Sequence, residues 1–123
     1  MSKLNYLHIC ENAFLSEGNR NLNLIGIFDT INTMGFPAMQ PRFAIVANLT
    51  ADTNTKHKTT LLIKKGDKNL FELNVNFEGV KHQIIQNFLN FPFPEQGSYE
   101  VIISLDDITL GSTTITLNKI GNL

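Results

Sequence analysis

Three histidines and one cysteine are the residues of this chain best suited to bind a metal ion. His8, His57 and His82 lie far apart in the sequence, and none has a usual ligand spacing from Cys10 or from a carboxylate. The pattern therefore predicts no metal site. We interpret the histidines as ordinary surface or core residues.

Cys10 is also the one candidate thiol nucleophile. It ends a predicted strand, and no helix N-terminus or Gly-x-Ser-x-Gly elbow is predicted that would activate a Cys or a Ser. A free cysteine is more often a small buried hydrophobic residue, and phosphate-binding Gly-rich motifs are absent. We therefore expect no enzyme and no cofactor. A pocket that combines Cys10, Glu11 and Asp29, in an enzyme or an accessory subunit, is kept as a third hypothesis.

Adjacent carboxylates occur at Asp106 and Asp107. Two acids in a short polar segment are usually turn formers, because Asp tolerates left-handed backbone and bonds to its own backbone. A calcium site needs a series of further oxygen ligands, which does not accompany this pair. The sequence favours a turn.

A basic run flanks a short predicted strand at 61–63. Such a run can bind an anionic partner, for example single-stranded nucleic acid on a β surface. It can equally protect the edge of a sheet, where lysines prevent pairing between molecules. The candidate anion-binding residues are Lys56, Lys58, Lys64, Lys65 and Lys68.

The stretch Asp29–Arg42 is the candidate interaction surface. Its Gly and Pro residues argue against regular structure, and it is too apolar for an idle solvent loop. Either it closes one end of the fold as a lid on the core, or it docks a partner, since Met and Phe are favoured at interfaces. The residues concerned are Met34, Phe36, Pro37, Met39, Pro41 and Arg42.

Period-2 alternation of apolar and polar residues dominates the rest of the chain. It is clearest at 71–78 and 99–105, where every second residue is apolar. Further strands are expected at 4–10, 22–28, 43–49, 61–63 and 109–117. The segment 82–89 also suits a short amphipathic helix, and we favour a strand. About eight short strands predict an all-β fold, a two-sheet β-sandwich.

Two local features refine this fold. The inward phase of the last strand slips at Leu110, which a bulge at Gly111–Ser112 would repair. The segment Pro94–Tyr99 resembles the tyrosine corner of immunoglobulin-like sandwiches, in which a Tyr hydroxyl bonds to backbone a few residues upstream. Together they favour an immunoglobulin-like Greek key.

Composition sets the broad class. The chain has 123 residues, a usual size for one domain, so we expect a single domain over 1–123. Ten basic and eleven acidic residues give a net charge of −1, which argues against nucleic-acid binding as the main role and against polybasic membrane attachment. A lone cysteine and the lack of a signal peptide or spanning segment predict a cytoplasmic location.

A set of short motifs spread along the chain is similar to one family. The motifs are Leu7–Glu11, Leu24–Asp29, Phe36–Ala38, Pro41–Phe43, Gly97–Tyr99 and Leu110–Ser112. Through them the chain resembles an uncharacterised family of short bacterial all-β proteins. The resemblance spans nearly the whole chain. It implies a stand-alone domain in a bacterial or prophage setting and assigns no activity, so no functional residue is carried over.

The sequence thus predicts a non-enzymatic binding module with a protein partner or with self-association. The alternative is a binder of anionic ligands or single-stranded nucleic acid through the lysines of 56–68.

Overall fold

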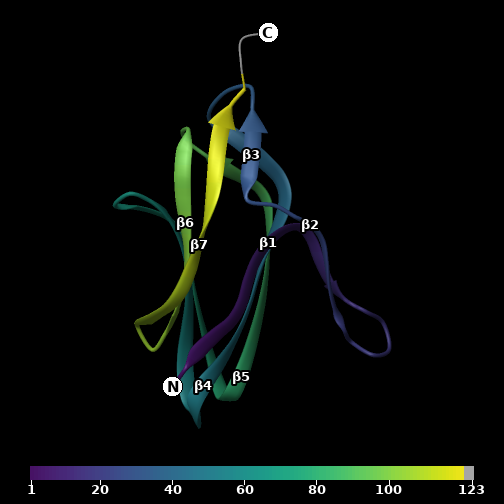
Figure 1. Ribbon diagram of the computed structural model, residues 1–123, viewed down its shortest axis with the longest axis vertical. Helices are drawn as coiled ribbons and strands as arrows, with labels where there is room; N and C mark the ends of the chain where they lie inside the picture. Colours follow the sequence, from purple (N-terminus) through teal and green to yellow (C-terminus); the bar gives the residue numbers. More distant parts are fainter. Residues whose placement is uncertain (121–123) are drawn as a thin grey trace.

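The computed structural model describes residues 1–120, and this part of the chain is built from strands without a helix (Figure 1). The strands are β1 (Lys3–Leu15), β2 (Leu22–Ile27), β3 (Thr30–Thr33), β4 (Ala38–Lys65), β5 (Lys68–Phe93), β6 (Gly97–Leu105) and β7 (Ile108–Lys119). The all-β prediction is confirmed. Within residues 1–120 no helix is long and apolar enough to cross a membrane.

The long β4–β5 hairpin organises the sheet. The first half of β4 pairs with β1, its second half pairs with β6, and β5 follows β4 throughout. The strand order is β2-β1-β4-β6-β7-β3, with β5 beside β4. The two predicted sheets are therefore halves of one continuous sheet, because the same two strands run through both.

A bulge bends this hairpin in the middle. Thr50 pairs with Lys81 and Thr55 with Gly79, so residues 51–54 of β4 lie opposite a single residue of β5. Extra residues on one strand force that strand to bend. We call residues 51–54 the β4 bulge.

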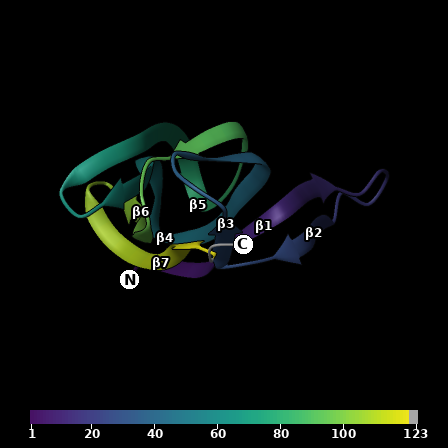
Figure 2. The same cartoon turned by 90° about the horizontal axis from the view of Figure 1, so that it is seen from above.

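The bent sheet encloses one main core. Phe43 and Ile45 from the first half of β4 pack in the same cluster as Ile63 from its second half, Tyr99 of β6 and Leu117 of β7. Seen from above, the strands wrap around this core while the β1–β2 hairpin extends to one side (Figure 2). Aromatic rings of β5 link the two halves, since Phe71 meets Phe88 edge to face at 4.9 Å.

The strand count differs from the eight expected. The predicted strands at 43–49 and 61–63 are both parts of β4, and those at 71–78 and 82–89 are both parts of β5. The residue types of the β4 bulge and Gly79 are those of turns between separate strands, but in the structure these residues bend one continuous hairpin. The prediction of a strand over 82–89 is confirmed.

The prediction that 29–42 lacks regular structure is wrong. Thr30–Thr33 forms β3, which pairs in parallel with β7, and β4 already begins at Ala38. Pro41 is tolerated because β4 pairs only with β5 there, so one edge of the strand needs no backbone donor. Within 29–42, Asp29 and residues 34–37 lie outside the strands, and the bond between Phe36 and Pro37 is cis.

Both local refinements have counterparts in the structure. The β6–β7 register shifts so that Leu110 is the extra residue, one position before the expected bulge. The Tyr99 hydroxyl donates to the Glu95 carbonyl and accepts from the Glu95 N–H at 3.0 Å. The tyrosine corner is therefore present.

Candidate functional site

β3 and β7 end and β4 begins at the upper end of the molecule (Figure 1), and several large apolar residues in and beside these segments are exposed. Met34, Met39 and Leu89 are 58%, 55% and 74% exposed. Met39 pairs with Pro92, and Arg42 pairs with Leu89, where the β4–β5 hairpin has its open end. We define the apolar end surface as the exposed residues Met34, Pro37, Met39, Pro41, Arg42, Leu89 and Pro92.

The structure divides the candidate stretch between the two roles considered for it. Phe36 is half-buried and packs on the core, and Ala38 is buried within it. Met34, Pro37, Met39, Pro41 and Arg42 face outward. Phe36 therefore takes part in the packing of the core, while its neighbours are exposed.

Leu89 and Pro92 are members that the sequence pattern did not reveal. The backbone of Asn90 is left-handed, with φ of 54°, and the burial phase changes there. Phe88 and Phe93 are buried although they lie five positions apart. Strict alternation would place only one of them inward. In the sequence, the spacing of two large apolar residues five positions apart, Phe88 and Phe93, was the feature that could have indicated this break in the alternation.

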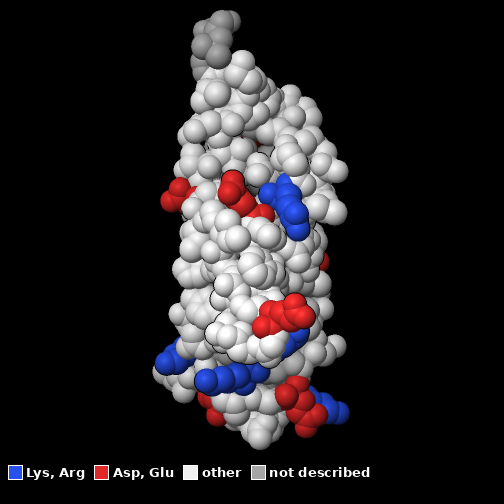
Figure 3. Space-filling view, turned by 90° about the vertical axis from the view of Figure 1, so that its right-hand side faces the viewer, with Lys and Arg blue, Asp and Glu red and all other residues white. Residues whose placement is uncertain are grey.

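The five lysines do not form one patch. Lys56, Lys58 and Lys64 lie on the outer face of β4, but Lys58 and Lys64 are six positions apart on this strand, a distance of about 20 Å. Lys58 is paired with Asp107 at 2.9 Å, and Lys65 with Glu95 at 3.3 Å. On the face shown in Figure 3, basic and acidic side chains lie close together both above the middle of the molecule and toward its lower end.

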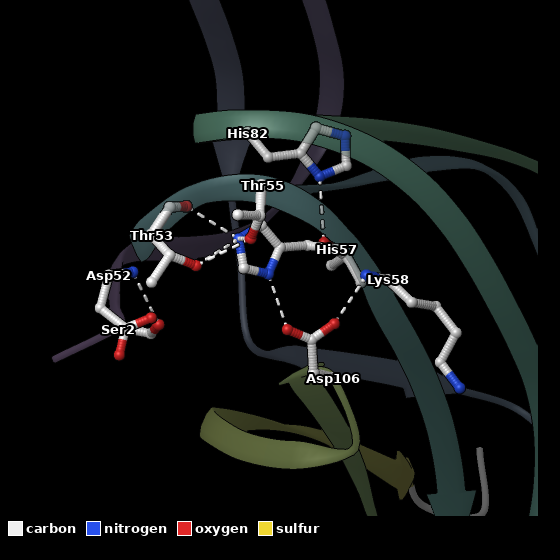
Figure 4. A network of polar contacts seen from close by, with 9 residues as sticks. Ser2, Asp52, Thr53, Thr55, His57, Lys58, His82 and Asp106 are labelled. Carbon is white, nitrogen blue, oxygen red and sulfur yellow. Dashed lines mark hydrogen bonds and ion pairs between the residues drawn. The ribbon is translucent and has the colours of Figure 1, made fainter.

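His57 joins the β4 bulge to the β6–β7 turn (Figure 4). Its side chain is 5% exposed, because the inward phase of Leu61 and Ile63 extends back along β4 to His57. Its Nδ1 lies 2.6 Å from Asp106 Oδ2, and its Nε2 lies 2.9 Å from the Thr53 carbonyl oxygen. The hydroxyls of Thr53 and Thr55 are 3.3 Å from Nε2.

Asp106 binds β4 through two further hydrogen bonds. Its Oδ1 accepts from the Lys58 N–H at 2.9 Å, and its own N–H donates to the Lys58 carbonyl at 2.8 Å. The φ angles of Asp106 and Asp107 are 50° and 68°, which a type I′ turn requires. The prediction that these acids form a turn is confirmed, but the contacts of Asp106 with His57 and Lys58 were not foreseen.

Hydrogen bonding shifts the protonation of this cluster. The carboxylate of Asp106, followed by the Thr53 carbonyl, raises the pKa of His57 above its usual value. The hydrogen bond from His57 lowers the pKa of Asp106. The nearby His82, stacked on Phe77 at 4.3 Å, has a pKa lowered by burial.

A shallow hollow of about 590 Å³ lies beside this cluster. His57, Phe77 and Asp106 line it together with Lys56, Lys58, Asn76 and Glu78. An Asp–His pair beside a hydroxyl group is the arrangement of a catalytic triad. In a triad the Nε2 atom of the His needs a free lone pair to take the proton of the hydroxyl. Here Nε2 lies closest to a carbonyl, to which it can only donate. The arrangement suits a structural ion pair better than a general base.

Cys10, Glu11 and Asp29 do not share a pocket in this structure. Cys10 is fully buried against Ala13, Ala44 and Val46, as expected for a small hydrophobic residue, and burial raises the pKa of its thiol. Asp29 lines a separate hollow with residues that include neither of the other two. Among residues 1–120 no group of three His, Cys, Asp or Glu side chains is placed to hold a metal ion.

Residues 5–118 match a family described as "Family of unknown function (DUF6941)". The chain belongs to this family. The resemblance to an uncharacterised family is thereby confirmed. No curated protein matches the chain.

Solved structures similar to this DUF6941 chain share its fold at low sequence identity. An immunoglobulin-like protein from Pseudomonas aeruginosa has 12% identity and a TM-score of 0.53, with 96% of this chain and 97% of that chain covered. The alkylpurine DNA glycosylase AlkC of Pseudomonas fluorescens, bound to DNA containing an abasic site analog, has 13% identity and a TM-score of 0.53. That match covers 95% of this chain and 30% of AlkC. These likenesses support the immunoglobulin-like fold.

Proposed function

We propose that this chain is a non-enzymatic module that docks a partner protein on the apolar end surface. The observation that carries the proposal is the exposure of Met34, Met39 and Leu89 at one end of the fold. Large apolar side chains that cluster on a surface mark interaction sites more often than isolated ones do. Met side chains adapt to the shape of a partner.

Arg42 indicates which charged group that partner would present to the surface. It is exposed beside Leu89, and it forms no ion pair within residues 1–120. Arg favours planar, bidentate contacts with carboxylates. The partner segment would therefore present apolar side chains next to an acidic residue.

The chemistry of the remaining candidates supports a role without catalysis. Nε2 of His57 is occupied by the Thr53 carbonyl, and the Cys10 thiol is buried. We also propose a cytoplasmic location, since a free buried cysteine needs no oxidising compartment. Cell fractionation with an antibody to the chain tests that location.

Photo-crosslinking tests the surface directly. The chain has three methionines, and replacing them with a photo-reactive analogue labels Met34 and Met39 at the upper end and Met1 near the β6–β7 turn. We expect crosslinks to a partner protein from Met34 and Met39 but not from Met1. Leu89→Asp and Arg42→Glu should remove them, while Ile108→Asp, at an exposed apolar residue near the other end, should not.

Three outcomes would contradict the proposal: crosslinks from Met1 alone, equal crosslinks from all three methionines, or insensitivity to Leu89→Asp. Crosslinks from Met34 and Met39 only to a second copy would assign the surface to self-association, the other form of partner expected from the sequence.

The second candidate function is binding of an anionic ligand or a single strand of nucleic acid through the exposed Lys56 and Lys68. Neither lysine forms an ion pair within residues 1–120, and a similar structure belongs to a protein bound to DNA. Fluorescence anisotropy with single-stranded DNA at low salt tests it. Binding that weakens steeply with salt would support it, and no anisotropy change would remove it.

A further inference from the structure

Both ring nitrogens of His57 face hydrogen-bond acceptors. Nδ1 meets the Asp106 carboxylate and Nε2 meets the Thr53 carbonyl oxygen, at 2.6 and 2.9 Å. A neutral imidazole has one donor and one acceptor nitrogen, whereas the imidazolium has two donors. Only the protonated ring satisfies both neighbours. The Asp106 carboxyl stays ionised because its other oxygen accepts from the Lys58 N–H.

The contacts of this imidazolium connect segments that are distant in the sequence. Through Asp106 it binds the β6–β7 turn, and through Thr53 it binds the β4 bulge (Figure 4). No buried side-chain nitrogen or oxygen among the described residues lacks a partner. A change in the charge of His57 therefore disturbs an otherwise satisfied network.

The charged groups around His57 are few and of both signs. On β4, Asp52 adds to the attraction for a proton, while Lys56 and Lys58 flank the hollow. From the β6–β7 turn come Asp106 and Asp107, the latter paired with Lys58. From β5 come Glu78, at the rim of the hollow, and the uncharged ring of Phe77, 5.3 Å from the His57 ring; His82 lies beyond Phe77.

We propose that His57 is a pH-sensitive latch, which fastens the β6–β7 turn to the β4 bulge when protonated and loosens both when it loses its proton. On deprotonation one ring nitrogen exposes a lone pair to an acceptor. The Thr53 carbonyl then faces Nε2 without a proton between them, or the contact with Asp106 is lost. The hydrogen bond that remains is weaker, because its donor is no longer charged.

The direction of the effect follows from the protonation states. The pKa of His57 is raised in the folded protein, so its contribution is complete below about 6.5, the value of an unperturbed His. It is lost as pH rises through the higher folded-state value. The pKa of Asp106 is lowered, so its contribution is present above the usual value for an aspartate and is lost as pH falls through the lower folded-state value.

Two measurements on the full chain test the latch. Imidazole ¹⁵N chemical shifts across pH 4–10 should show both nitrogens of His57 protonated at pH 6, with a titration midpoint above about 6.5. Asp106→Asn should lower that midpoint by about 1 pH unit or more. The matched control, Asp107→Asn in the same turn, should change it much less.

Hydrogen exchange measures the loosening itself. The amides of Lys58 and Asp106 should lose protection about tenfold, relative to hydrogen-bonded amides of β5 away from the hollow, as pH crosses the His57 midpoint, because the charged hydrogen bond gives way to a weaker neutral one. The latch would be wrong if His57 were neutral at pH 6, or if Asp106→Asn left its midpoint unchanged. A constant ratio of exchange rates across the titration in wild type would also overturn it, whether or not the variants fold.

Discussion

Tyr99 is fully buried, yet its hydroxyl makes two hydrogen bonds to the backbone of Glu95. These bonds fix the segment that connects β5 to β6. Removing a buried hydrogen-bonding group costs about 1–2 kcal/mol, because its partners lose their contacts. At the scale of the residue, the contribution of the tyrosine corner to stability can therefore be measured by a substitution that removes only the Tyr99 hydroxyl.

Tyr99→Phe should lower the free energy of unfolding by about 1–2 kcal/mol without changing the fold. The urea midpoint should fall while the slope stays constant. Tyr6→Phe is the control, because the Tyr6 hydroxyl bonds to Gln83 at an exposed position. An equal loss in both variants would show that the corner contributes nothing particular.

Tyr99 and His57 also show which residues can be interpreted from local sequence. The partner of Tyr99 lies four positions away, so a turn followed by Gly-x-Tyr was a sufficient signal. Asp106 lies 49 positions from His57. Alternation along β4 indicates that His57 points inward, but no local pattern identifies the carboxylate that it meets.

At the scale of elements, the β6–β7 turn combines two demands. A type I′ turn favours Gly or Asn where both central residues have positive φ, but this turn uses Asp106 and Asp107. Asp106 serves the contacts with His57 and Lys58, whereas Asp107 is exposed and paired only with Lys58. Both positions need a residue that tolerates positive φ, but only position 106 needs a carboxylate that reaches His57 and the Lys58 N–H.

We therefore expect opposite effects from the same substitution. Asp107→Gly should raise the free energy of unfolding by up to about 1 kcal/mol, because glycine adopts positive φ without strain. Asp106→Gly should lower it, since the bonds to His57 and Lys58 are lost. Thermal unfolding of the two variants at pH 6 measures the difference. Stabilisation by both would show that the contacts of Asp106 add little.

At the scale of the whole molecule, Phe88 and Leu89 separate stability from recognition. Phe88 is buried and joins the two halves of the bent sheet through Phe43 and Phe71. Its neighbour Leu89 is 74% exposed on the apolar end surface. Phe88→Ala should cost about 3–5 kcal/mol, because it leaves a cavity where the halves meet.

Leu89→Ala should change the free energy of unfolding by less than about 0.5 kcal/mol while weakening the proposed crosslinks from Met39. Denaturant unfolding and crosslinking yield measure the two quantities separately. A large loss of stability from Leu89→Ala would mean that this side chain belongs to the core.

The sequence by itself determined the all-β class, the inward faces of 43–49, 71–78 and 99–105, and the turn at Asp106–Asp107. These features depend on neighbours within a few positions, so alternation and turn chemistry carry the information. Only the tertiary structure decided that the four strands predicted at 43–49, 61–63, 71–78 and 82–89 form the two long strands β4 and β5. The sequence could not show this, because the residues of the β4 bulge and Gly79 are of types that also form turns. The tertiary structure also decided that Leu89 joins Met39, that Lys58 and Lys64 lie apart, and that His57 meets Asp106. Those relations depend on pairing register between distant segments, which only the folded sheet specifies.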